Sequence, residues 1–173
     1  MTIFGYFYSK KVYKKDYMKI FSISFIGISL YQAIGKLGCF SAGCCYGKPT
    51  SFFLGMNFKY LGNNIHPYAG KMIHPTQLYE SFFNLVNFSF LLFLFKRNKT
   101  SEKIISFYFI NYGLIRFAEE YLRNDPGRGY LIKNSSSLLS LSVPQIYSLI
   151  FILFGISLCN NFFTIKKNKE KNI

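Results

Sequence analysis

Ionisable side chains of both signs lie close together in an otherwise apolar stretch of the sequence. Arg116 is followed by two glutamates and a second arginine, Glu119, Glu120 and Arg123. On an α-helix, offsets of three, four and seven residues fall within one stripe about 100° wide. Charged groups inside a membrane span are costly unless they are paired or face a cavity, and arginine binds phosphate through two parallel hydrogen bonds. The stripe therefore predicts a functional site, with an interfacial ladder of salt bridges as the alternative.

A second candidate is a glycine-rich segment at the end of an apolar run, residues 35–50, which reads GKLGCFSAGCCYGKPT. Its glycines are Gly35, Gly38, Gly43 and Gly47. They predict close or left-handed turns of the backbone. Irregular backbone at membrane depth is tolerated only where protein buries it or where it lines a wet cavity. We therefore expect Lys36 at the base of such a cavity, and a lysine that snorkels to the interface is the alternative.

The cysteines of this segment, Cys39, Cys44 and Cys45, allow several interpretations. With His74 they would offer ligands for zinc, but the usual pair of cysteines separated by two residues is absent, and adjacent cysteines rarely bind one tetrahedral ion together. A disulfide between Cys39 and Cys44 is a second interpretation, because we expect the loop to face an oxidising compartment. Small apolar residues packed in a tight turn are the third. We predict no metal and no cofactor.

A third polar group, HPTQLYE at residues 74–80, lies where another apolar run begins. Thr76 is a suitable N-cap for a helix that starts there, and a proline precedes it. Capping explains the threonine alone. It does not explain why His, Gln, Tyr and Glu crowd the same end of one span, so this group is also a functional candidate.

These groups adjoin apolar runs that are long enough to cross a bilayer. The uncharged runs cover residues 20–35, 81–95, 104–115 and 134–165, and the third continues as a helical pattern to residue 122. A spanning helix needs about 20 mostly apolar residues. We predict an all-α, polytopic membrane protein with one transmembrane domain over residues 1–173, about four transmembrane helices and two long outward-facing loops. Buried helices of a soluble protein are the alternative, but such runs leave too little polar surface.

Composition and charge agree with a membrane protein. Of 173 residues 50% are hydrophobic and 16% charged, and 21 Lys plus Arg against 7 Asp plus Glu give a net charge of +14. A disordered polycation would be poor in Phe, and a soluble nucleic-acid-binding protein would spread its Lys among shorter apolar runs, so we expect no nucleic-acid partner. Most basic residues lie in short segments at 10–19, 96–103 and 166–171. The positive-inside rule places these segments in the cytoplasm, with 166–173 as a basic tail, and no cleavable signal peptide is expected.

The motifs together resemble one family. The segments GKLGCFSAGCCYGKPT, HPTQLYE, YGLIRFAEEYLRNDPGRG and LSVPQIYSL occur in the order found in prolipoprotein diacylglyceryl transferases. The resemblance covers residues 5–165 and corresponds to the C-terminal two-thirds of that family. Its members are bacterial inner-membrane enzymes that move the diacylglyceryl group of phosphatidylglycerol to the lipobox cysteine thiol of a prolipoprotein, releasing glycerol phosphate. The resemblance implies such a transferase, with phosphatidylglycerol, the lipobox and the membrane as partners and a cytoplasmic C-terminus.

The resemblance also implies roles for single residues. Arg116 resembles the family's catalytic arginine, and Glu120 resembles the acidic residue four positions later. Lipid or headgroup binding falls to the residues that match the motifs, which are Lys36, Gly47, His74, Gln77, Tyr79 and Arg123. Lys36 replaces an arginine, which keeps the charge but loses the planar fork. Cys39 replaces an asparagine and Cys44 replaces a glutamate, so a thiol stands where the family uses a carboxylate.

Two other functions come from different classes. The family's His-Gly-Gly segment, with a proposed catalytic histidine, would precede Met1, and neither His66 nor His74 is placed to replace it. This feature and the change to Cys44 favour a truncated or inactive relative that binds phospholipid or a lipoprotein precursor without catalysis. The remaining hypothesis is a thiol-based redox or metal protein that uses the three cysteines and His74.

Overall fold

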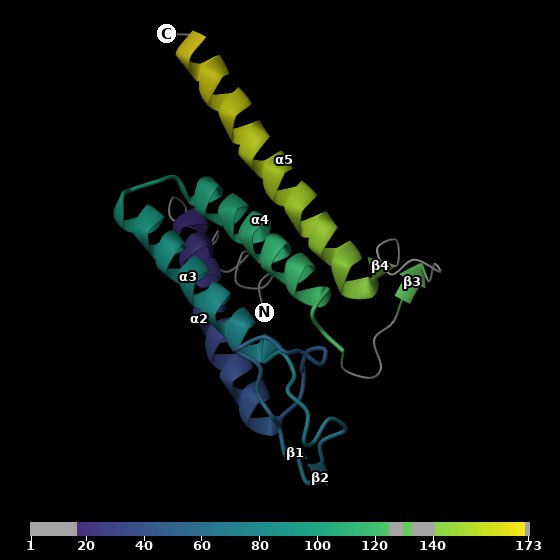
Figure 1. The fold of residues 1–173 in the computed structure, drawn as a ribbon. Coiled ribbons are helices and arrows are strands. Elements are labelled where there is room, and N and C mark those ends of the chain that lie inside the picture. The colour runs from purple at the N-terminus through teal and green to yellow at the C-terminus, as the bar shows by residue number, and fades with distance from the viewer. Residues whose placement is uncertain (1–16, 125–129, 133–140, 172–173) are drawn as a thin grey trace.

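Helices make up most of the chain that the structure describes (Figure 1). The structure is a computed structural model, and it describes residues 17–124, 130–132 and 141–171. The helices are α2 (Tyr17–Ala42), α3 (Thr76–Lys96), α4 (Ser101–Glu120) and α5 (Val143–Lys171). Two short antiparallel pairs join β1 (Tyr60–Leu61) to β2 (Asn64–Ile65) and β3 (Tyr130–Ile132) to β4 (Leu141–Ser142). The predicted all-α class and the predicted number of helices are confirmed over this part of the chain.

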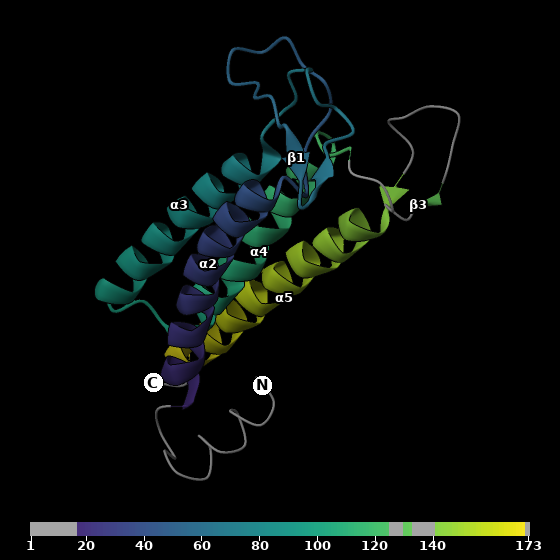
Figure 2. The same ribbon diagram turned by 90° about the horizontal axis from the view of Figure 1, so that it is seen from below.

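The helices run alternately up and down, which gathers the long connections at one end (Figures 1 and 2). Helix α2 packs on α3, and α4 packs on α5. A short turn at residues 97–100 joins α3 to α4 at the opposite end. Residues 43–75 and the segment that carries β3 and β4 therefore lie at the same end of the molecule, as predicted. The end of α2 and the starts of α3 and α5 also lie at this end.

Glycines set the close approach of α4 and α5. A Cβ atom added at Gly113 would lie 2.8 Å from the carbonyl oxygen of Ser148, and one added at Gly155 would lie 2.8 Å from that of Ser106. Helices in a membrane associate through such close packing of small residues, because the surrounding lipid is apolar and the hydrophobic effect does not drive them together. The two glycines thus fix how α5 crosses the helix that carries Arg116.

The polar and apolar residues are distributed as a membrane protein requires. Asn84 of α3 is fully buried, whereas Phe82 on the same helix is 60% exposed and Leu153 of α5 is 67% exposed. Inside, the amide of Asn87 donates to Ser29 Oγ at 3.2 Å and accepts from the amide of Asn111 at 2.9 Å, which links α2, α3 and α4. Apolar side chains outside and polar groups that join the helices inside suit a hydrocarbon surrounding and disfavour the soluble alternative.

Three helical segments in the described residues are long and apolar enough to span a membrane: Tyr17–Ala42, Thr76–Lys96 and Val143–Asn160. Helix α4 is not among them, because it carries charged residues at both ends. It packs against the other helices, and the charges near its end belong to the site described below. Helix α5 continues through Lys171, so the basic segment predicted as a tail from residue 166 largely continues the helix.

The glycine-rich segment differs from its prediction. Gly35 and Gly38 lie within α2, which continues to Ala42, and a Cβ atom at either would meet nothing within 4 Å. The turns predicted at Gly35 and Gly38 do not form, because the helical hydrogen bonds of α2 continue past both residues to the end of the helix. The turn comes at Gly43, which has a φ of +72° and donates its N–H to the carbonyl of Phe40 at 3.1 Å. This is a left-handed helix terminus, the position that glycine favours.

Candidate active site

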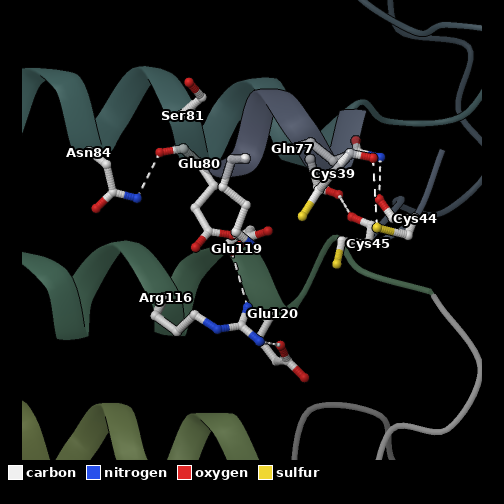
Figure 3. A network of polar contacts seen from close by, with 12 residues as sticks. Cys39, Cys44, Cys45, Gln77, Glu80, Ser81, Asn84, Arg116, Glu119 and Glu120 are labelled. Atoms are coloured by element: carbon white, nitrogen blue, oxygen red, sulfur yellow. Dashed lines mark hydrogen bonds and ion pairs between the residues drawn. The ribbon is translucent and has the colours of Figure 1, made fainter. Parts of the chain in front are cut away.

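Charged side chains from three helices meet near the end of the molecule that carries the long connections. Figure 3 shows those of α3 and α4. We call Lys36, Glu80, Arg116, Glu119 and Glu120 the charge cluster. The ammonium group of Lys36, on α2, forms an ion pair with the carboxylate of Glu80, on α3. On α4, Arg116 contacts Glu119 at 3.1 Å through Nη1 and Glu120 at 3.0 Å through Nη2. The cluster therefore joins α2, α3 and α4 by charge.

These ion pairs are largely buried. The side chains of Glu80 and Glu119 are each 4% exposed, while those of Lys36 and Arg116 keep 18% and 17%. Buried charges must be paired, since an uncompensated one costs several kcal/mol. The two cations are thus held by carboxylates that cannot turn to solvent, and each retains an accessible edge.

The predicted helical stripe is confirmed for three of its members and wrong for the fourth. Arg116, Glu119 and Glu120 share one face of α4, as offsets of three and four residues require. Helix α4 ends at Glu120, so Arg123 lies beyond the helix. There it pairs with Gly47 as an isolated antiparallel bridge, is largely buried, and still acts electrostatically on Lys36. Arg123 therefore reaches the cluster from the loop side.

Gly47 is needed where the first loop crosses the end of α4. A Cβ atom there would lie 2.6 Å from His74 Cβ and 2.9 Å from the carbonyl oxygen of Leu122. The backbone N–H of Gly47 donates to the carbonyl of His74 at 3.0 Å, and that of Lys48 donates to Leu122 at 2.7 Å. The structure thus gives Gly47 a packing role, between the loop and the strand-like segment that carries Arg123.

The HPTQLYE motif binds the turn that contains Cys44 and Cys45, here called the cysteine turn, to the start of α3. Pro75 occupies the N-cap position and no side chain caps the helix, so the predicted cap at Thr76 is wrong. Thr76 lies inside the first turn and its hydroxyl donates to the carbonyl of Cys45 at 2.6 Å. The amide of Gln77 donates to the carbonyl of Cys44 at 2.6 Å. The long-range carbonyls compete successfully with the local cap, because the turn after Gly43 is brought directly over the helix start.

Neither histidine takes part in the ion pairs found among the described residues. His74 Nδ1 is 3.3 Å from the hydroxyl of Tyr79, and its ring packs near Phe52. His66 is buried between aromatic rings, with Tyr46 at 4.4 Å and Phe58 at 5.6 Å between ring centroids. Burial lowers the pKa of His66, which keeps its ring neutral at physiological pH. Both histidines therefore have packing contacts that account for them.

The three cysteines of the glycine-rich segment converge, and we call Cys39, Cys44 and Cys45 the thiol cluster. All are free thiols, and their Sγ atoms lie within 4.8 Å of one another. The disulfide between Cys39 and Cys44, one of the three interpretations of these cysteines, is not formed, and the group of clustered ligand atoms does not include His74. Burial and the two neighbouring thiols raise the pKa of Cys44 to about 12. Cys44 is therefore neutral at physiological pH and cannot supply the negative charge of a carboxylate.

Two cavities flank the charge cluster. One, of about 310 Å³, lies between α3 and α4, with Glu80 and Glu119 at its polar end and Phe83 and Leu114 among its apolar walls. The other, of about 380 Å³, lies between α4 and the start of α5 and is lined by Arg116 together with mainly apolar side chains. A charged end and apolar walls are the features that an amphiphilic ligand needs.

The family described as prolipoprotein diacylglyceryl transferase matches residues 1–160. The chain belongs to this family. Phosphatidylglycerol–prolipoprotein diacylglyceryl transferase of Clostridium tetani is 37% identical over 158 residues, which are 90% of this chain and 57% of that protein. The transferase 2 of Clostridium perfringens is 40% identical over 144 residues, 83% of this chain and 52% of that protein. This member of the diacylglyceryl transferase family therefore spans little more than half the length of the relatives it matches. No solved structure matches the chain.

Glu80 belongs to a candidate group in the sequence of this family member, but its ion pair with Lys36 was not predicted, and Glu119 had no separate role. A usable signal was present, because both Lys36 and Glu80 stand beside apolar runs where neither charge can stay unpaired. Two unpaired charges of opposite sign at the same end of neighbouring helices are expected to meet. In contrast, the contacts of Gln77 and Thr76 with the cysteine turn had no such signal.

Proposed function

We propose that the chain carries the substrate-binding and reacting centre of a diacylglyceryl transferase in the bacterial inner membrane, with its C-terminus in the cytoplasm. The substrates would be phosphatidylglycerol and the lipobox cysteine of a prolipoprotein. The observation that carries the proposal is Arg116, which two buried glutamates hold at the mouth of a largely apolar cavity. Membership of the family and the identity of the relatives support the same reaction.

The reaction is a substitution at the glycerol carbon that bears the headgroup phosphate. The incoming cysteine sulfur forms the new C–S bond, the C–O bond to the phosphate breaks, and its electron pair leaves with glycerol phosphate. The thiol proton must be removed, because the thiolate is the nucleophile. The leaving phosphate gains charge, so the protein must supply fixed positive groups close to it.

Arg116 and Lys36 are the groups that would receive this charge. Two of the N–H donors of Arg116 contact Glu119 and Glu120, so its remaining N–H donors would bind the phosphate oxygens, and Lys36 would add a point charge from α2. Glu119 and Glu120 hold the guanidinium in place, which removes the cost of orienting it during the reaction. We assign Glu120 a second role, acceptance of the thiol proton. Arg123, on the segment after α4, adds positive charge behind Lys36.

The headgroup would be positioned from the loop side. Tyr79 lines the cavity between α3 and α4 together with Glu80, and its hydroxyl contacts His74. We propose that this pair contacts the glycerol of the headgroup. Gln77 and Gly47 would act indirectly, since their described contacts hold the cysteine turn and the end of α4 in register.

A non-catalytic member that binds phospholipid or a lipoprotein precursor is the second candidate. The specific observation in its favour is Cys44, a neutral thiol where the resembled enzymes have a carboxylate. Binding of the anionic lipid requires only the cations and the cavities. In this alternative Arg116 and Lys36 still bind the phosphate, but no group has to remove the thiol proton.

One assay separates the two candidates. The chain in detergent is mixed with phosphatidylglycerol and a lipobox peptide, and the peptide mass is followed together with lipid binding. We expect a diacylglyceryl mass gain that falls about 10²–10³-fold in Arg116→Ala, the usual cost of losing one stabilising donor. Arg97→Ala, at the far end of α3, is the matched control and should react at the parent rate. Lipid binding without transfer would establish the second candidate, and neither binding nor transfer would refute both.

A further inference from the structure

The thiol cluster is assigned no role by the reaction above. It lies beside Gln77 and away from Arg116, where the end of α2 meets the loop (Figure 3). Its cysteines come from two different backbone conformations. Cys39 lies in the last turn of α2, while Cys44 and Cys45 follow the left-handed turn at Gly43. The chain therefore reverses direction so that the three thiols face one another.

The spacing of the thiols is close to that of a metal site. Zinc–sulfur bonds are about 2.3 Å long, so sulfur atoms that share one ion lie about 4 Å apart. The three Sγ atoms already lie within 4.8 Å of one another. A small closing movement would bring all of them to bonding distance of a single ion. A disulfide uses two sulfurs, and this arrangement brings in a third.

Adjacent cysteines rarely bind one ion, but the backbone conformation at Cys45 allows it here. Cys45 has a φ of 61°, an uncommon conformation for a residue with a Cβ atom. In an extended chain successive side chains point to opposite sides. Left-handed backbone at Cys45 turns its side chain towards that of Cys44. The carbonyl groups of both residues are held by Thr76 and Gln77, which keeps this conformation in place.

Gln77, whose amide contacts the backbone of Cys44, is the candidate for a fourth ligand. Gln77 is fully buried, and its Oε1 atom has no hydrogen-bond partner among the described residues. The amide nitrogen of the same group lies 2.6 Å from the carbonyl oxygen of Cys44. An unpaired amide oxygen in a buried position is costly, and a cation would satisfy it.

We propose that the thiol cluster is a binding site for a thiophilic metal cation such as Zn²⁺. The ion forms bonds to the sulfurs of Cys39, Cys44 and Cys45, the three thiol protons pass to solvent, and Gln77 Oε1 completes the coordination. Three thiolates select soft and borderline cations over Mg²⁺ or Ca²⁺. The site would tie the end of α2, one turn beyond Lys36, to the loop and to α3. It does not depend on the transferase reaction, and each can fail without the other.

The first test uses the full chain in detergent, reduced with a phosphine and freed of metal, and titrated with Cd²⁺ as the probe. We expect a thiolate-to-cadmium absorption band that saturates at one ion per chain and is reversed by a chelator. Cys44→Ser should weaken binding by more than about 100-fold, since even losses outside the first coordination shell cost 10–100-fold. Cys159→Ser, on α5, is the matched control and should bind as the parent does. Equal binding in both variants, or no saturable band in the parent, would overturn the proposal.

A second test needs no substitution and so does not depend on the folding of a variant. The native chain is alkylated with and without Zn²⁺, and each cysteine is read by peptide mass spectrometry. We expect Zn²⁺ to protect Cys39, Cys44 and Cys45 while Cys159 reacts equally in both samples. Equal modification of the three cysteines with and without Zn²⁺ would contradict the proposal.

Discussion

At the residue scale, the site depends on charges that no single helix can satisfy. Lys36 and Glu80 come from α2 and α3, and their ion pair is largely shielded from solvent. Arg116 is held within its own helix by Glu119 and Glu120. The first pair is therefore tertiary and the second local. They should respond differently to substitution, because only the first couples two helices.

Removing one partner of the tertiary pair should destabilise the protein. In Lys36→Met the carboxylate of Glu80 loses its ammonium partner, and breaking a buried pair in this way costs about 3–5 kcal/mol. The double variant Lys36→Met with Glu80→Met should recover most of that loss, since apolar residues of similar volume replace buried ion pairs at little cost. Denaturant unfolding in detergent measures both values. A double variant as unstable as the single one would show that the pair is not the source of the effect.

Cys44 should react with alkylating reagents only at high pH. The thiolate is the reactive form, and burial with two neighbouring thiols raises the pKa to about 12 from an ordinary value of about 8.5. Below the raised pKa the thiolate fraction grows tenfold with each pH unit. In chelator-treated protein, the rate at Cys44 should therefore still rise between about pH 9 and 11, whereas the same cysteine in unfolded chain levels off. A native rate that levels off at the unfolded pH would contradict the assignment.

At the element scale, the loop of residues 43–75 is held to the helices by close backbone approach. Gly47 touches both His74 and the end of α4, and Thr76 and Gln77 fix the cysteine turn from the start of α3. The loop therefore has little freedom where it passes the charge cluster. This rigidity holds Arg123 and the thiol cluster in fixed positions relative to the helices.

Two glycines of the same motif should differ sharply when a methyl group is added. Gly47→Ala would place Cβ 2.6 Å from His74 Cβ and 2.9 Å from the Leu122 carbonyl oxygen, and overpacking of this kind costs about 1–3 kcal/mol. Gly38→Ala meets nothing within 4 Å on α2 and should be neutral or stabilising by up to about 1 kcal/mol. Thermal unfolding of the two variants beside the parent gives the comparison. Equal stability of Gly47→Ala and the parent would remove Gly47 from its packing role.

At the scale of the whole molecule, buried polar groups and exposed apolar side chains fit a bilayer. The long connections gather at one end, and the α3–α4 turn lies at the other (Figure 2). From the charge bias we propose that this turn and the end of α5 lie in the cytoplasm. The charge cluster would then open towards the outer side, where both proposed substrates present their reacting atoms.

Cysteines introduced at the two ends should reveal this orientation. Asn63→Cys lies in the turn between β1 and β2, and Lys99→Cys lies in the turn between α3 and α4. A thiol reagent that does not cross membranes should label the first in intact cells and the second only after lysis. The parent chain gives the background from its own cysteines. Labelling of Lys99→Cys alone in intact cells would invert the proposed topology.

The sequence by itself determined the features that depend on near neighbours. Apolar runs of sufficient length predicted the helices, and offsets of three and four residues placed Glu119 and Glu120 beside Arg116. The same local reasoning failed at Gly35 and Gly38, because helical hydrogen bonding continued past them. It also failed at Thr76, whose hydroxyl donates to the distant carbonyl of Cys45 and does not cap the helix.

Only the tertiary structure decided which distant residues meet. The partner of Lys36 is 44 positions away on another helix, and the partners of Thr76 and Gln77 lie in the loop before α3. Such contacts depend on how far each helix is shifted along its neighbour and on where the chain reverses. Those quantities follow from packing summed over whole helices, at points such as Gly113 and Gly155. The convergence of the three thiols belongs to this class, since it rests on a left-handed turn held in place from α3.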